Sequence, residues 1–302
     1  MSTNLNAAPA HLPALNLPRR NWQRWVSMLV SLALLGAILI QFNHLGTTRL
    51  AAVVPRTPIF WLGIVTYYLT LPASEWVIFR RLWRLPVGGF AVLLRKLVSN
   101  EVLFGYSGEL SFYAWARRHS GLTNAPFGAI KDVSITSALA GNLFTLLMLA
   151  LSWPFFHTLP TALNMHAMAA SVGVVLVGAM LVGLFNRQLF SLPGREIGMM
   201  LGVHLTRLVI TTTLSAVIWH SAMPEVALSL WIVLAALQLL VTRLPFIPNK
   251  DLVFANVTLM VVGPHSDIGP LIALIATIIL AMHLLIGGLL AIVDLLDEGD
   301  AR

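Results

Sequence analysis

Apolar residues fall into long runs, separated by short polar stretches, along most of the 302-residue chain. A transmembrane helix takes about 20 apolar residues, and seven runs reach that length. The pattern therefore predicts an all-α integral membrane protein with about seven transmembrane helices, at roughly 25–45, 59–80, 133–155, 167–186, 198–220, 226–244 and 268–294. Around this polytopic domain, 25–295, we expect a flexible cytoplasmic tail over 1–24 and an acidic tail over 296–302.

Two shorter apolar segments do not fit a span. Residues 88–120 mix large apolar side chains with Arg, Lys and Glu. A single Arg or Lys at mid-bilayer costs roughly 2.5–3.5 kcal/mol, so this segment is too charged to cross. Apolar residues in it recur at helical spacing, which predicts a helical hairpin of about 89–104 and 108–119, with Ser107 as a cap of the second helix. The other segment, 245–264, carries an apolar stretch that is too short to cross and is bracketed by prolines.

Composition and charge agree with a membrane protein. The chain is 58% hydrophobic, 10% charged and free of cysteine, which excludes disulfides and thiolate chemistry. Its net charge of +7 does not require nucleic acid as a partner, because the positive-inside rule accounts for it. A cytoplasmic N-terminus places most Lys and Arg inside, and both shorter segments then enter from the cytoplasmic side.

The order of segments suggests a repeat. Two helices, a short re-entrant segment and a further helix describe 25–155, and the same series describes 198–294. Both halves start on the same side, so the sequence predicts a parallel repeat. Short apolar segments at matching places in two halves are typical of a transporter's binding site.

Charged residues inside predicted spans are functional candidates by default. Glu75 and Arg207 are two of them, and His204 lies one helical turn before Arg207. A Glu75–Arg207 pair would neutralise both charges, and separate interhelical partners are the alternative. In the predicted hairpin, the outer ends would present basic side chains near the cytoplasmic interface, either to an anionic phosphate or merely as anchors on anionic lipid. These residues are Arg95, Lys96, Arg117 and Arg118.

Two stretches resemble a known family. NEVLFGYSGELSFYAWARRHSG is similar to the start of the flippase-like transmembrane domain of bacterial lysylphosphatidylglycerol synthases, with Gly108, Glu109, Arg117 and Arg118 at the matching positions. ALQLLVTRLPFIPNKDLVFANVTLM resembles that family's second landmark, a span followed by a proline-rich turn, and Pro245 and Pro248 match its prolines. The family usually has Gly-Gly after the second proline and an acidic residue further on. This chain has Asn249, Lys250 and Ala255–Asn256 there, so it resembles a stand-alone, divergent member.

The resemblance implies a bacterial inner-membrane protein that binds and translocates a phospholipid or a polyprenyl-linked glycolipid between leaflets. The partner would be an anionic phospholipid or a polyprenyl-phosphate-linked lipid, with a glycosyltransferase or lipid synthase as a further candidate. We expect no enzyme activity, cofactor or metal, because no acid–base, nucleophile or metal cluster is recognisable. The headgroup would be bound by Glu109, Arg117, Arg118, Arg207 and Lys250, with Glu75 and His204 as intramembrane polar residues.

The alternative is a non-transporting membrane subunit or scaffold of a cell-envelope lipid or glycolipid biosynthesis enzyme. The two functions predict different interiors. A transporter predicts a polar cavity at mid-membrane lined by Glu75, His204 and Arg207. A scaffold predicts that these side chains pack against each other without a cavity.

Overall fold

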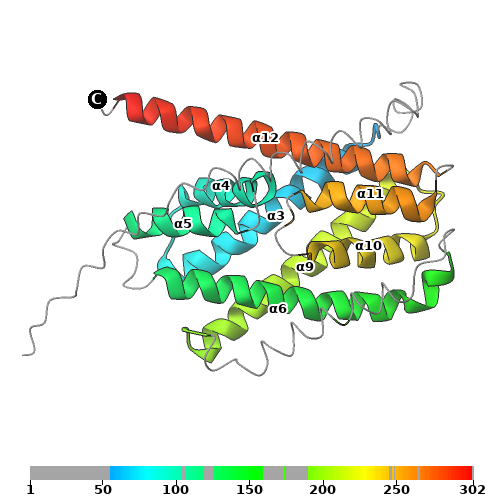
Figure 1. Cartoon of the computed structure of the whole chain (residues 1–302), viewed down its shortest axis with the longest axis horizontal. Helices are drawn as coiled ribbons and strands as arrows, with labels where there is room; N and C mark the ends of the chain where they lie inside the picture. Colours follow the sequence, from blue (N-terminus) through cyan, green and yellow to red (C-terminus); the bar gives the residue numbers. More distant parts are fainter. Residues whose placement is uncertain are drawn as a thin grey trace, which may run out of the picture.

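The computed structural model describes the chain in several stretches. These are residues 55–103, 106–118, 126–158, 173, 190–244, 247, 249–263 and 266–300. The described part is helical; most of its helices run along one long axis, and others cross them obliquely (Figure 1). The predicted spans 25–45 and 167–186 and the predicted tail 1–24 lie outside the described residues.

Four described helices are long and apolar enough to cross a membrane. They are α3 (Pro58–Trp83), α6 (Pro126–Ser152), α9 (Gly194–Ala222) and α12 (Ile268–Asp300). They confirm the expected helices near 59–80, 133–155, 198–220 and 268–294, and large apolar side chains such as Leu62, Val209 and Leu285 face outward from them. These features suggest a multi-pass membrane protein. α12 continues to Asp300, so the expected tail from 296 is helical over most of its length.

The predicted hairpin within 88–120 is present. α4 (Gly89–Val102) and α5 (Ser107–Arg118) pack against each other as its two arms. The Ser107 hydroxyl donates to the carbonyl of Ser99 at 2.6 Å, and the side-chain oxygen of Asn100 accepts the Gly108 N–H at 2.7 Å. The expected cap at Ser107 is therefore wrong, because Asn100 satisfies the first turn of α5 from the facing arm.

A second hairpin replaces the predicted span 226–244. α10 (Leu228–Thr242) has 15 residues and α11 (Lys250–Val262) has 13. At 1.5 Å per residue α10 is about 22 Å long, less than the roughly 30 Å of the hydrocarbon core. α10 and α11 pack side by side, and the middle of α10 is buried by protein. The continuous apolar sequence of α10 reflects its burial by protein. Sequence pattern alone does not distinguish such a helix from one that is buried in lipid.

The two hairpins enter from opposite ends of the bundle and meet at their tips (Figure 1). The α4–α5 arms share a core with the C-terminal half of α3 and with Met200 near the start of α9. The α10–α11 arms share a different core with the N-terminal half of α3 and with Trp219 near the end of α9. The tips are joined by a backbone hydrogen bond of 3.1 Å from the Asn249 N–H to the Glu101 carbonyl.

This arrangement makes the repeat inverted, not parallel. Each half is a long helix, a hairpin and a second long helix: α3, α4–α5, α6 and then α9, α10–α11, α12. The halves exchange partners, because α4 packs on α12 while α10 packs on α6. Treating 226–244 as a span reverses the direction of everything after it. That one error accounts both for the predicted parallel repeat and for the expectation that both short segments enter from the cytoplasmic side.

The hairpin tips share an unusual backbone conformation. Tyr106 (φ 72°) and Asn249 (φ 50°) both adopt positive φ immediately before the second arm of their hairpin. Gly is the usual residue there, and Asn is one of the few others that adopt this conformation readily. Asn249 therefore meets the backbone requirement at a position where the resembled family usually has glycine.

Close packing of the first hairpin depends on Gly108. A Cβ at Gly108 would overlap the backbone carbonyl of Lys96, whereas one at Gly202 on α9 would meet nothing. We expect Gly108→Ala to lower the stability of the protein by about 1–3 kcal/mol, as overpacking does. Thermal unfolding in detergent would measure this loss. Gly202→Ala is the matched control and should not destabilise, and equal behaviour of the two variants would contradict the tight contact.

The structure also predicts on which side α12 ends. Ile279 and His283 of α12 lie at the centre of the bundle. Further along α12, the carbonyl of Leu290 accepts a hydrogen bond from the Arg95 side chain on α4. α12 therefore ends beside the start of α4, at the end of the bundle that carries Arg80 and Arg81.

By the positive-inside rule we expect this end to face the cytoplasm. In a bacterial host, a fluorescent protein fused after α12 should fluoresce and alkaline phosphatase fused there should be inactive. Fusions at Glu225, between α9 and α10, should give the opposite result. Active phosphatase after α12 would show that the orientation is wrong.

Candidate functional site

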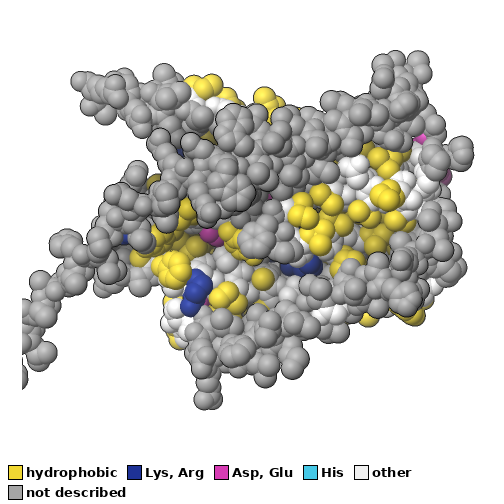
Figure 2. Space-filling view, viewed as in Figure 1, with side chains coloured by type: hydrophobic (Ala, Val, Ile, Leu, Met, Phe, Trp, Pro, Cys, Tyr) yellow, Lys and Arg dark blue, Asp and Glu magenta, His cyan; other side chains and the backbone are white. Residues whose placement is uncertain are grey.

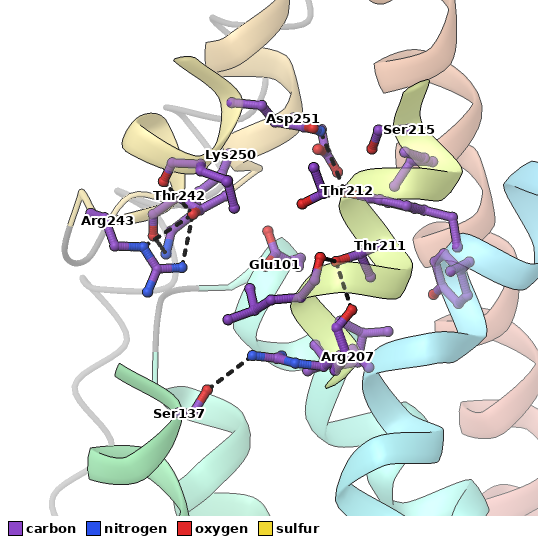
Figure 3. Close-up of a pocket in the computed structure, with 18 of the residues that line it drawn as sticks. Glu101, Ser137, Arg207, Thr211, Thr212, Ser215, Thr242, Arg243, Lys250 and Asp251 are labelled. Carbon is purple, nitrogen blue, oxygen red and sulfur yellow. Dashed lines mark hydrogen bonds between the residues drawn. The ribbon is translucent and has the colours of Figure 1, made fainter. Parts of the chain in front are cut away.

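A polar cavity of about 260 Å³ lies where the two hairpin tips meet. Seven helices contribute to its wall, which is unusually rich in charged and hydroxyl side chains for the centre of a membrane protein (Figure 3). The polar residues that line it are Tyr67, Tyr68, Glu101, Ser137, Arg207, Thr211, Thr212, Ser215, Gln238, Thr242, Arg243, Lys250, Asp251 and His283.

Three cations from three different elements reach the cavity. Arg207 comes from the middle of α9, Arg243 follows the last residue of α10, and Lys250 is the first residue of α11. In Figure 3, Arg243 and Lys250 lie on one side of the cavity and Arg207 on the other. The site therefore presents positive charge from more than one direction.

Neutral groups hold these cations in place. Arg207 Nη2 donates to Ser137 Oγ at 3.2 Å. Arg243 donates to Thr242 Oγ1 from Nε at 3.2 Å and from Nη2 at 2.8 Å, and Lys250 Nζ donates to the Thr242 carbonyl at 3.0 Å. Within the described residues none of the three forms an ion pair, and the buried Arg207 Nε has no hydrogen-bond partner. Their positive charge is thus not cancelled by contact with a carboxylate.

Two carboxylates also line the cavity, Glu101 from the end of α4 and Asp251 from the start of α11. With all five groups ionised, the three cations exceed the two carboxylates by one charge. The Thr212 hydroxyl faces the same space, whereas the Thr211 hydroxyl donates to the carbonyl of Arg207 at 3.0 Å. Three cations around one cavity suit a phosphate or another oxyanion, because charge-assisted hydrogen bonds are the strongest available in proteins. The volume suits a small polar group.

A separate ion-pair cluster lies beside this cavity. It consists of Glu75 on α3, Lys96 on α4 and Glu109 on α5, and we call it the Lys96 cluster. Lys96 Nζ contacts Glu75 Oε1 and lies 3.2 Å from Glu109 Oε1. The side chains are only 5% (Lys96), 11% (Glu75) and 19% (Glu109) exposed. The cluster fastens both arms of the first hairpin to a spanning helix.

The Lys96 cluster corrects two expectations. Lys96 is buried and does not face the cytoplasmic interface, because α4 turns it towards α3 and α5. Glu75 makes its ion pair with Lys96, so the Glu75–Arg207 pair is not formed, and Arg207 bonds to Ser137 instead. Lys96 lies off the apolar stripe of its helix, so the sequence pattern suggested a side chain at the interface. Its partners are carboxylates within the protein.

The structure brings some predicted site residues together and separates others. Arg207 and Lys250 share the cavity, and Glu109 lies in the adjacent Lys96 cluster. Arg117 is exposed eight residues further along α5, about 12 Å from Glu109, with its guanidinium 5.9 Å from the Tyr113 ring. The side chain of Arg118 lies outside the described residues. His204 is fully buried on α9 and, like Glu75, does not line the cavity.

Sequence reasoning missed Arg243, Glu101 and Asp251. Each stands at the end of an apolar segment, where a charged residue normally marks the membrane interface. The signal for Arg243 and Asp251 was the proline-rich turn between them, which marks a break in the middle of an apolar region.

Comparisons with protein-family models, curated proteins and solved structures give no match. The resemblance to the flippase-like domain therefore stays a prediction, and the function is argued from the site.

Removing the central cation of the Lys96 cluster should be costly. Lys96→Met leaves two buried carboxylates without their partner, and breaking a buried pair in this way costs about 3–5 kcal/mol. Thermal unfolding in detergent should show the loss, while Met at the exposed Arg195 should leave stability unchanged. The triple variant Glu75→Gln, Lys96→Met, Glu109→Gln should recover most of it. A single variant as stable as the wild type would contradict the cluster.

Proposed function

We propose that this protein binds the anionic headgroup of a membrane lipid in the central cavity and translocates the lipid between leaflets. The observation that carries the proposal is the set of three cations, Arg207, Arg243 and Lys250, around one cavity without an ion-pair partner among the described residues. Charge at mid-membrane is expensive and is a functional feature by default. A ligand that brings negative charge explains the surplus.

The opposed hairpins support movement of such a ligand. The cavity lies between two tips that approach from opposite ends, so withdrawal of either tip would open it towards that end. Inverted repeats with binding at the midplane are one common architecture for alternating access. A scaffold needs neither the cavity nor the meeting of the tips.

A lipid substrate fits the surroundings of the cavity better than a soluble anion. Hydrophobic side chains cover much of the described outer face, and Lys and Arg atoms reach the surface near its centre (Figure 2). A headgroup could thus occupy the polar interior while its hydrocarbon tail stays in the bilayer. The proposed substrates remain an anionic phospholipid or a polyprenyl-linked glycolipid in a bacterial inner membrane. Arg117, which is exposed on α5, would meet the headgroup first at the cytoplasmic interface.

Reconstitution in liposomes tests the proposal. With fluorescent phosphatidylglycerol as the probe, we expect wild type to move lipid between leaflets faster than protein-free liposomes do. Arg207→Gln and Lys250→Gln should each slow this at least about tenfold, because a hydrogen bond to a charged group contributes about 1.5–3 kcal/mol. Arg195→Gln, at an exposed position on α9, is the matched control and should keep the wild-type rate.

Fluorescent phosphatidylcholine, whose headgroup is zwitterionic, should move more slowly than the anionic probe. Equal rates for both lipids, or full activity of both cavity variants, would show that the cations do not select the substrate. Wild type that moves neither lipid would contradict translocation of phospholipids.

A further inference from the structure

Helix α11 takes the cap of its first turn from the other hairpin. Asn249, the residue before α11, makes no side-chain hydrogen bond to that turn. The Asn249 N–H donates instead to the Glu101 carbonyl at 3.1 Å, and the Lys250 N–H is hydrogen-bonded to the Glu101 side chain. Glu101 therefore holds the start of α11 with both its backbone and its carboxyl group.

The end of α4 supplies the second arms of both hairpins in this way. The side chain of Asn100 accepts the Gly108 N–H at the start of α5, and the next residue, Glu101, binds the start of α11. The two caps differ in charge and in reach. The neutral amide of Asn100 acts within its own hairpin, whereas the acidic side chain of Glu101 joins the two hairpins and lines the cavity.

The Glu101 carboxyl group occupies a position that also suits an anionic ligand. The first N–H groups of a helix and the positive end of its dipole make the start of an α-helix favourable for anions. At α11 this end faces the cavity, and Lys250 adds an ammonium group beside it (Figure 3). That ammonium donates to the Thr242 carbonyl. Glu101 thus binds the backbone donor of Lys250 and leaves the ammonium for a ligand.

An anionic headgroup in the cavity competes with Glu101 for the start of α11. Like charges brought together in a poorly solvated interior repel each other strongly. Asp251 lines the same cavity, but its side chain is hydrogen-bonded to Gln238 on α10, the other arm of its own hairpin. Moving Asp251 aside would therefore leave the two tips joined, whereas moving Glu101 aside breaks a contact between them.

We infer that Glu101 is an internal counter-anion at the start of α11, that a bound headgroup displaces it, and that this displacement releases one hairpin tip from the other. The inference rests on the proposed function for the ligand, and it adds the step that couples binding to opening of the cavity. The empty protein holds its tips together with a carboxylate of its own. Once the headgroup takes the place of that carboxylate, the tips are free to part.

Distances between spin labels on the two tips test the displacement. The chain contains no cysteine, so the substitutions Leu110→Cys, in the first turn of α5, and Leu244→Cys, after α10, create the only labelling sites. Both positions are exposed and lie outside the cavity wall. Pulsed electron spin resonance on the detergent-solubilised protein should give a longer distance after short-chain phosphatidylglycerol is added to saturation. Calorimetry with the same lipid measures its binding.

Three variants in this labelled background separate displacement from simple repulsion. Glu101→Gln removes the competing charge. It should show the longer distance without lipid and bind the lipid at least about fivefold more tightly, the lower end of typical coupling between sites. Glu101→Asp keeps the charge but is one methylene too short to reach the Lys250 N–H. It should also show the longer distance without lipid, which covers the case of a Glu101→Gln protein that does not fold. Asp251→Asn removes the same charge from the cavity and should keep the wild-type distance without lipid.

The outcomes distinguish the displacement from the anion site on which it rests. Lipid binding with an unchanged distance, as protonation of Glu101 or Asp251 in place would give, would overturn the displacement and leave the anion site standing. The same conclusion would follow if Asp251→Asn lengthened the distance as much as Glu101→Gln. Absence of lipid binding to the wild-type cavity would overturn the anion site and the displacement with it.

Discussion

Four helix ends lie in the middle of this bundle, and each must satisfy its backbone polar groups away from bulk water. A membrane interior tolerates such breaks only where protein or a water-filled cavity supplies partners. Here one bond runs between the tips, from the Asn249 N–H to the Glu101 carbonyl, and another runs within the first tip, from the Gly108 N–H to the Asn100 side chain. Polar side chains collect where these ends meet. The central cavity is thus a consequence of opposing two hairpins.

The buried charges fall into two groups with different roles. Lys96 is enclosed by two carboxylates and fastens the first hairpin to α3, so its charge is used within the protein. Arg207, Arg243 and Lys250 are held by hydroxyl and carbonyl oxygens, which fix their positions without cancelling their charge. The charge of the first group is therefore neutralised by direct contact within the protein, whereas the cations of the second have no carboxylate in contact among the described residues.

Sequence pattern predicted what depends on local periodicity. The spanning helices and the first hairpin follow from apolar spacing and from charge in 88–120, and Arg207 follows from its place inside a span. The sequence pattern failed where the surroundings of a residue determine its role. α10 is apolar because protein surrounds it, and Lys96 is polar although it is buried; neither fact is visible without the neighbours. Arg243 and Glu101 were missed because a charge at the end of an apolar run has the same appearance at an interface and at a buried tip.

The two halves share a backbone arrangement but differ in the charged side chains at their hairpin tips. Both hairpins have a positive-φ residue at the tip and an acidic residue in the first turn of the second arm, Glu109 in one and Asp251 in the other. Among the described residues, the first hairpin adds a buried lysine that fastens this arm to a long helix, whereas the second adds a cation that lines the cavity. The same backbone arrangement therefore places a neutralised cation beside one tip and a cation without a carboxylate in contact beside the other. The symmetry of the fold does not extend to the charges that its two tips carry.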